Sequence, residues 1–164
     1  MPEHDKQSTN MSSCCQRRQL VGGLIAGSVT AVLSSTSVTA GGGDSILQPD
    51  VPDDAAFIAR AFKMRNLATA LGDQPYGAVV VRKNVIIGHS HSRVVVEHDP
   101  TGHAELAAIR DTARRLSDRD LSGSILYSSS RPCPMCEGAA YWANITEMKY
   151  GRDATSAGQP KLCR

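Results

Sequence analysis

The sequence lacks a strong excess of charge of either sign. Its 164 residues include 18 Lys and Arg against 16 Asp and Glu, which gives a formal net charge of +2. The densest charge run, residues 110–120, mixes both signs as a solvated helix face does. Internal repeats are absent too, which excludes the solenoid and propeller folds that repeats produce. None of these features implies a nucleic-acid partner.

A hydrophobic run long enough to span a membrane is also missing. The apolar stretch Leu20–Leu33 is short and interrupted by Gly and Ser, so we expect no stable membrane span. It follows the basic pair Arg17 and Arg18 and precedes small residues, which is the order of a secretory signal. QRRQLVGG resembles a twin-arginine leader, although Gln16 stands where that motif usually has Ser.

These features predict a twin-arginine signal peptide over residues 1–40 and a periplasmic or exported protein. The alternative is a disordered tail with an accidental apolar patch, in a cytoplasmic protein. Residues 41–52, which begin GGGDS, are expected to form a flexible joint. Residues 53–164 would then form one domain, because about 124 residues after the leader are a usual size for a single core.

Strand and helix patterns alternate along the predicted domain, which favours an α/β fold with helices packed on a sheet. A β-branched segment turns at Lys83 and Asn84, which indicates a hairpin. Asp99 and Pro100 are typical of a helix N-cap and a first helical residue. The expected elements are helices over 52–72, 99–116 and 134–144, the hairpin over 76–90, and strands over 122–130 and 146–151.

Cys133 and Cys136 lie three residues apart, between a predicted strand and a helix N-terminus. A Cys-x-x-Cys in this place suits a disulfide, a thioredoxin-like redox dithiol or a metal site. The two cysteines alone do not decide between these uses.

His103 and Glu105 favour the metal. Catalytic zinc takes three protein ligands and leaves a fourth position for water, and one imidazole with two thiolates is an allowed set. His103, Cys133 and Cys136 supply that set, each expected in the first turn of a helix. Glu105 lies two residues beyond His103 and cannot share its face of a helix, so it is better placed as a general base than as a ligand. A structural zinc would need a fourth ligand, for which Cys163 is the nearest candidate.

HAE at 103–105 followed by PCPMC at 132–136 resembles the signature of the zinc-dependent cytidine and deoxycytidylate deaminase superfamily. From about Asp53 to Gly151 the chain is similar to guanine deaminases and their tRNA adenosine deaminase relatives. The resemblance implies a three-layer α/β/α sandwich with a mixed five-stranded sheet, of which the four predicted strands would be the first four. It also implies a hydrolytic nucleobase or nucleoside deaminase in which zinc-bound hydroxide attacks the ring carbon and Glu105 moves the protons.

Residues of the expected substrate pocket follow from the same resemblance. Tyr76 and Trp142 match aromatic positions that border the base in the guanine branch, so a free purine, guanine first, is the favoured substrate. Ser92 falls where the family usually has a base-binding Asn, and Arg131 replaces a common Glu. Export would argue against tRNA as the substrate, and homodimerisation is left open.

The C-terminal elements appear shortened relative to the family, because the chain ends about fourteen residues after the last predicted strand, Thr146–Gly151. The alternatives that this leaves are a non-catalytic zinc-binding protein and an exported CxxC thiol-disulfide oxidoreductase.

Overall fold

The computed structural model describes residues 45–162, so the predicted leader with Arg17 and Arg18 lies outside the described residues. Three helices and five strands make up this part of the chain. None of its helices is both long and apolar enough to cross a bilayer. In chain order the elements are α1 (Asp54–Ala70), β1 (Gly77–Arg82), β2 (Val85–His91), α2 (Ala104–Leu116), β3 (Ser124–Ser128), α3 (Pro134–Trp142), β4 (Glu147–Tyr150) and β5 (Thr155–Gly158).

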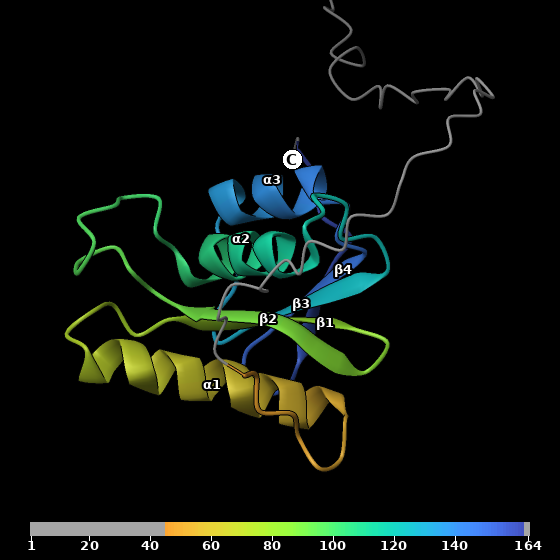
Figure 1. Cartoon of the computed structure of the whole chain (residues 1–164), viewed down its shortest axis with the longest axis horizontal. Helices are drawn as coiled ribbons and strands as arrows, with labels where there is room; N and C mark the ends of the chain where they lie inside the picture. The colour runs from red at the N-terminus through yellow and green to blue at the C-terminus, as the bar shows by residue number, and fades with distance from the viewer. Residues whose placement is uncertain (1–44, 163–164) are drawn as a thin grey trace, which may run out of the picture. The chain divides into compact units, whose positions relative to one another are not determined.

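The five strands form one mixed sheet in the order β2-β1-β3-β4-β5. β1 pairs antiparallel with both β2 and β3, β3 runs parallel to β4, and β5 is antiparallel to β4. Helix α1 covers one face of the sheet, while α2 and α3 lie together on the other (Figure 1). The predicted three-layer α/β/α class is therefore confirmed.

Alternate residues of β1 enter the two layers of the core. Ala78 and Val80 belong to a cluster with buried side chains of α2 and α3, whereas Val79 and Val81 pack with Phe57 of α1. Successive side chains of a strand point to opposite faces, so a strand covered on both faces must be apolar throughout. This explains why the AVVV run of β1 does not alternate with polar residues.

The hairpin was predicted correctly. Lys83 and Asn84 connect β1 to β2 with φ angles of 52° and 62°. A two-residue hairpin turn of this kind needs positive φ at both central positions, and Asn tolerates that conformation well. β2 thereby becomes an edge strand of the sheet.

Gln48, within the segment predicted as a joint, binds this edge. Its side-chain amide accepts a hydrogen bond from Ile86 N–H at 2.8 Å and donates one to Ile86 C=O at 2.9 Å. The Gln48 side chain thus pairs with the backbone N–H and C=O of Ile86 as a neighbouring strand would, and these groups would otherwise be unpaired at the sheet edge.

The predicted start of the second helix was wrong. Asp99 does not cap a helix, because its Oδ1 accepts hydrogen bonds from Thr101 N–H and the Thr101 hydroxyl, and its C=O accepts one from Gly102 N–H. Residues 99–102 therefore form a turn of their own, and α2 begins at Ala104 with His103 as its N-cap. His103 has extended backbone angles (φ −62°, ψ 145°) and lies just outside the helix.

A fifth strand, β5, completes the five-stranded sheet that the family resemblance implied, although the local sequence patterns predicted only the first four strands. Its residues Thr155–Gly158 are small and carry little strand propensity. They form a strand because they pair with β4, which is a tertiary contact that no local pattern reveals. After β5 the described chain, to Leu162, contains no further helix or strand.

Close packing of α2 on β2 gives a stability prediction. A Cβ added at Gly88 would overlap the Thr112 side chain and lie 2.9 Å from Thr112 Cα. Gly88→Ala is expected to lower the free energy of unfolding by about 1–3 kcal/mol through overpacking. The control is Gly138→Ala in α3, whose Cβ would meet only Leu162 at 4.0 Å and should be neutral or stabilising. Denaturant unfolding measures both, and equal stabilities would contradict the prediction.

Candidate metal centre

Two helix N-termini meet at the candidate site. His103 is the N-cap of α2 and Cys133 is the N-cap of α3, and neither side chain makes a capping hydrogen bond. Pro134 occupies the first position of α3, which places Cys136 on the first turn of that helix. The side chains of both N-caps are therefore available for another partner.

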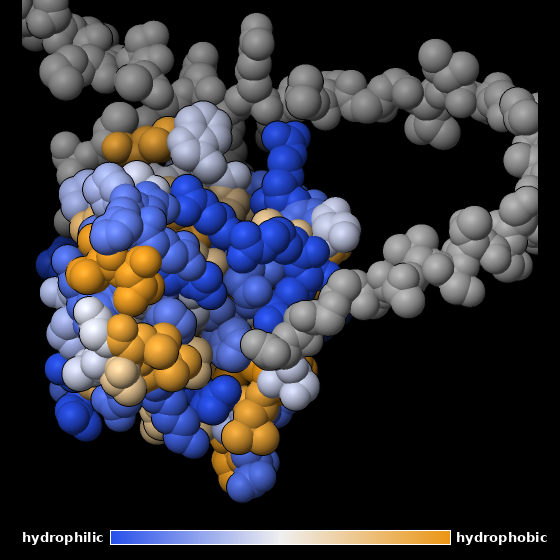
Figure 2. Space-filling view, turned by 60° about the vertical axis from the view of Figure 1, so that its left-hand side comes forward, coloured by the Kyte–Doolittle hydropathy of each residue, from blue (hydrophilic) through white to orange (hydrophobic). Residues whose placement is uncertain are grey.

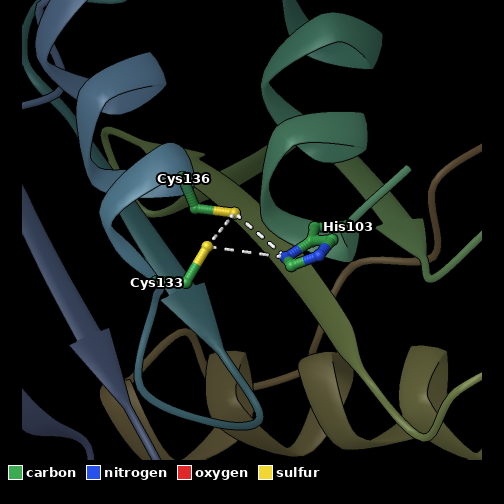
Figure 3. A group of neighbouring side chains, drawn as sticks. All are labelled: His103, Cys133 and Cys136. Carbon is green, nitrogen blue, oxygen red and sulfur yellow. Dashed lines mark hydrogen bonds between the residues drawn. The ribbon is translucent and has the colours of Figure 1, made fainter. Parts of the chain in front are cut away.

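The three predicted ligand atoms form a nearly equilateral triangle (Figure 3). Cys133 Sγ lies 3.6 Å from His103 Nδ1, Cys136 Sγ lies 3.8 Å from the same nitrogen, and the two sulfurs are 3.7 Å apart. A disulfide requires about 2.05 Å between sulfurs, so the cysteines are not bonded to each other.

These distances fit one tetrahedral zinc ion. Bonds of about 2.3 Å to sulfur and about 2.05 Å to nitrogen separate two sulfurs by about 3.8 Å and a sulfur from a nitrogen by about 3.6 Å. One imidazole and two thiolates are also a donor set that zinc accepts. Within the described part of the chain, the ligand atoms of these three residues all lie within 4.8 Å of one another. His103, Cys133 and Cys136 are thus arranged to hold a metal.

The surroundings of Cys136 favour the same use. Burial raises the pKa of its thiol, and the negative charges of Glu105 and Cys133 raise it further, while the Leu106 N–H has a smaller opposing effect. A bound cation would stabilise the thiolate here, whereas the protein alone does not.

Glu105 lies buried beside the triangle, with 4% of its surface exposed. Its Oε1 accepts a hydrogen bond from the Ser128 hydroxyl at 2.7 Å, and its Oε2 is 3.6 Å from Cys136 Sγ. One carboxylate oxygen is thus fixed while the other faces the ligand set. Sequence analysis missed Ser128, because nothing in the run SSS of residues 128–130 distinguishes it; only its place at the end of β3 brings it to Glu105.

Tyr76 and Ser92, both expected to contact substrate, lie side by side. Ser92 N–H donates to Tyr76 C=O at 3.0 Å, and Gly77, next to Tyr76, exchanges hydrogen bonds with Ser129. Tyr76 is 42% exposed, whereas Ser92 is completely buried. Their role in substrate binding remains a prediction.

Trp142 lies at the opposite end of α3 from the ligands. It is six residues beyond Cys136, about 9 Å along the helix axis, and it is 73% exposed with an edge contact to Tyr141. The ring contact of Trp142 is with Tyr141 and not with a ligand, so the predicted substrate contact of Trp142 also remains a prediction. Arg131, two residues before Cys133, places its guanidinium 6.0 Å from the centre of the Tyr150 ring.

The fold and the site define an α/β sandwich domain with a His-Cys-Cys metal centre and a buried glutamate beside it. The chain belongs to the cytidine and deoxycytidylate deaminase family: residues 51–152 match the family model of the cytidine and deoxycytidylate deaminase zinc-binding region. The predicted family and the predicted zinc cofactor are therefore confirmed.

Curated and solved relatives agree with the family. The chain is 42% identical to guanine deaminase of Bacillus subtilis over 85 residues, covering 52% of this chain and 54% of the relative. It is 36% identical to a tRNA-specific adenosine deaminase of Buchnera aphidicola over 98 residues, covering 60% of each. The solved B. subtilis guanine deaminase superposes with a TM-score of 0.56 at 40% identity, covering 58% of this chain and 61% of that one. The chain thus spans about half to three fifths of these relatives.

Proposed function

We propose that this protein is a zinc-dependent hydrolytic deaminase of a nucleobase or nucleoside. The observation that carries the proposal is the His103, Cys133 and Cys136 triangle with the Glu105 carboxylate beside it. Three ligands leave the fourth tetrahedral position for a reactant, which separates a catalytic zinc from a structural one. The match to the family model supports the same reaction class.

Zinc, when bound by these three residues, supplies Lewis-acid activation of water at neutral pH. The reaction adds water to the ring carbon that bears the exocyclic amine, breaks the carbon–nitrogen bond and releases ammonia. Glu105 is placed to take a proton from the water, pass it to a ring nitrogen and protonate the departing amine. Ser128 holds Glu105 Oε1, which leaves Oε2, the oxygen facing the ligands, as the proton carrier. The burial of Glu105 keeps bulk water from competing for these protons.

Guanine is the substrate we favour, with cytosine or a nucleoside next. The similarity to guanine deaminase of B. subtilis supports this choice. Ser92 offers one hydroxyl where an amide would offer both a donor and an acceptor, so we expect looser base selection.

Ammonia release from guanine, adenine, cytosine, guanosine and cytidine tests the substrate. Wild type is expected to act fastest on guanine, and Tyr76→Ala is expected to raise the KM for guanine, because it removes an aromatic surface against which the base can pack. Trp142→Ala, in the same assay, tests whether the exposed ring takes part. Activity on cytidine alone, unchanged in both variants, would reject guanine, whereas zinc-loaded protein inactive on every compound would reject the deaminase.

A further inference from the structure

Two loops contact each other, and one of them leads into the metal centre. One is the turn over residues 71–76 between α1 and β1, and the other is the loop over residues 92–102 between β2 and α2. They run side by side at one end of the molecule, where Ser92 N–H binds Tyr76 C=O (Figure 1). The second loop leads directly into His103.

Apolar side chains at the tip of the second loop are about half exposed. Val95 and Val96 at its tip are 48% and 47% exposed, and Leu71 in the first loop is 51% exposed. Figure 2 brings this side of the molecule forward and shows apolar side chains on an otherwise largely hydrophilic surface. The loop must therefore be held chiefly through polar contacts.

Asp73 supplies these contacts. Its carboxylate is 93% buried, being 7% exposed, and one oxygen, Oδ2, accepts the N–H groups of Val95 at 3.0 Å and Val96 at 2.9 Å. The other oxygen, Oδ1, accepts the N–H of Gln74 at 2.7 Å. One side chain thus joins the first loop to the tip of the second.

Electrostatics keep this carboxylate ionised. Burial raises the pKa of Asp73, but the hydrogen bonds from Val96 N–H, Gln74 N–H and Val95 N–H outweigh burial and lower the pKa to about 2. Since the folded-state pKa is depressed, the stabilisation is complete above about pH 4 and is lost as the pH falls toward 2.

The tip of the second loop is linked to the zinc ligand by a short rigid path. Arg93 N–H binds Gly102 C=O at 2.8 Å, which closes residues 93–102 into a ring, and His103 follows immediately. Gly102 packs so tightly that an added Cβ would lie 3.1 Å from the backbone of Arg93. Asp73 thus holds the tip of the loop that leads into His103, and the Arg93–Gly102 hydrogen bond holds its base.

We propose that Asp73 is a positioning residue for the metal centre, which holds the 92–102 loop so that His103 Nδ1 points at the two cysteine sulfurs. The proposal rests on the proposed zinc deaminase function, but it concerns the geometry of the ligand set and is tested without turnover. Groups that orient metal ligands from outside the ligand set commonly change metal affinity by about 10- to 100-fold.

The experiment compares full-length Asp73→Ala with wild type in three measurements: zinc affinity by chelator competition, the visible spectrum of the cobalt(II)-loaded protein, and amide hydrogen exchange. We expect zinc affinity to fall about tenfold or more, the cobalt bands to change as the His103 nitrogen shifts, and exchange to rise within residues 92–102. Asp73→Asn keeps one acceptor oxygen for Val95 and Val96, so it should restore part of the affinity.

The matched control is Asp118→Ala. Asp118 also accepts a backbone N–H, from Asp120 at 2.9 Å, in an exposed loop at the far end of α2. The Asp118→Ala substitution should leave the zinc affinity and the cobalt spectrum unchanged. Wild-type affinity and spectrum in Asp73→Ala would overturn the proposal, even with faster loop exchange. A uniform rise in exchange across the domain, or failure of both Asp73 variants to fold, would also overturn it by making Asp73 a stability residue. Absence of deaminase activity in wild type would count against the proposed function alone.

Discussion

Replacing Cys133 or Cys136 with serine is expected to reduce bound zinc from about one ion per chain to near zero. Each sulfur is one of only three ligands, and the hydroxyl of serine is a poor substitute for a thiolate. Deamination should disappear together with the metal.

Metal analysis of purified protein measures this result, and Cys163→Ser is the matched control. It makes the same chemical change at a cysteine that is not one of the three proposed ligands, so the zinc content should stay at the wild-type level. Full zinc content in Cys133→Ser would exclude Cys133 as a ligand. Wild-type protein without zinc, carrying a Cys133–Cys136 disulfide by mass spectrometry, would instead indicate a thiol-disulfide oxidoreductase.

Glu105→Gln is expected to separate metal binding from catalysis. The amide is close in size to the carboxylate and can still accept the Ser128 hydrogen bond, so zinc should remain at about one per chain. It cannot take up a proton, and loss of a positioned general base commonly lowers kcat by about 10²- to 10⁴-fold. Steady-state ammonia release together with zinc analysis on the same preparation measures both effects.

Glu137→Gln is the control for this substitution. Glu137 is equally buried and adjacent to Cys136 in the chain, but its Oε1 accepts the Lys161 N–H at 3.3 Å on another side of α3. Its variant should keep kcat within a few-fold of wild type. If Glu105→Gln lost its zinc, Glu105 would be a metal ligand and the proposed proton transfer would be wrong.

The distances in the folded protein favour a metal site over a redox dithiol for Cys133 and Cys136. A sulfur–sulfur distance of 3.7 Å is open to a reduced dithiol as well as to a metal. His103 Nδ1, nearly equidistant from both sulfurs, is not required by redox chemistry but completes a zinc ligand set.

The sequence by itself determined the secondary structure elements with strong local signals and the identities of the ligands. The apolar run of β1, the Lys83–Asn84 turn and Pro134 at the start of α3 act over a few residues, so they can be recognised locally. The ligands were recognisable because zinc accepts few side chains and because the HAE and PCPMC motifs are specific to one family.

Only the tertiary structure decided how far apart those ligands lie and which side chains support them. Ser128 and Asp73 have no local signal, because their hydrogen bonds to Glu105 and to the 92–102 loop cross 23 residues and 22–23 residues of sequence. The start of α2 and the presence of β5 depended on shorter-range contacts, namely the Asp99–Thr101 turn, which competes with a helix cap, and the pairing of β5 with β4. Local propensity fixes what a segment can form, but contacts between distant segments select among those forms and set the distances on which metal binding depends.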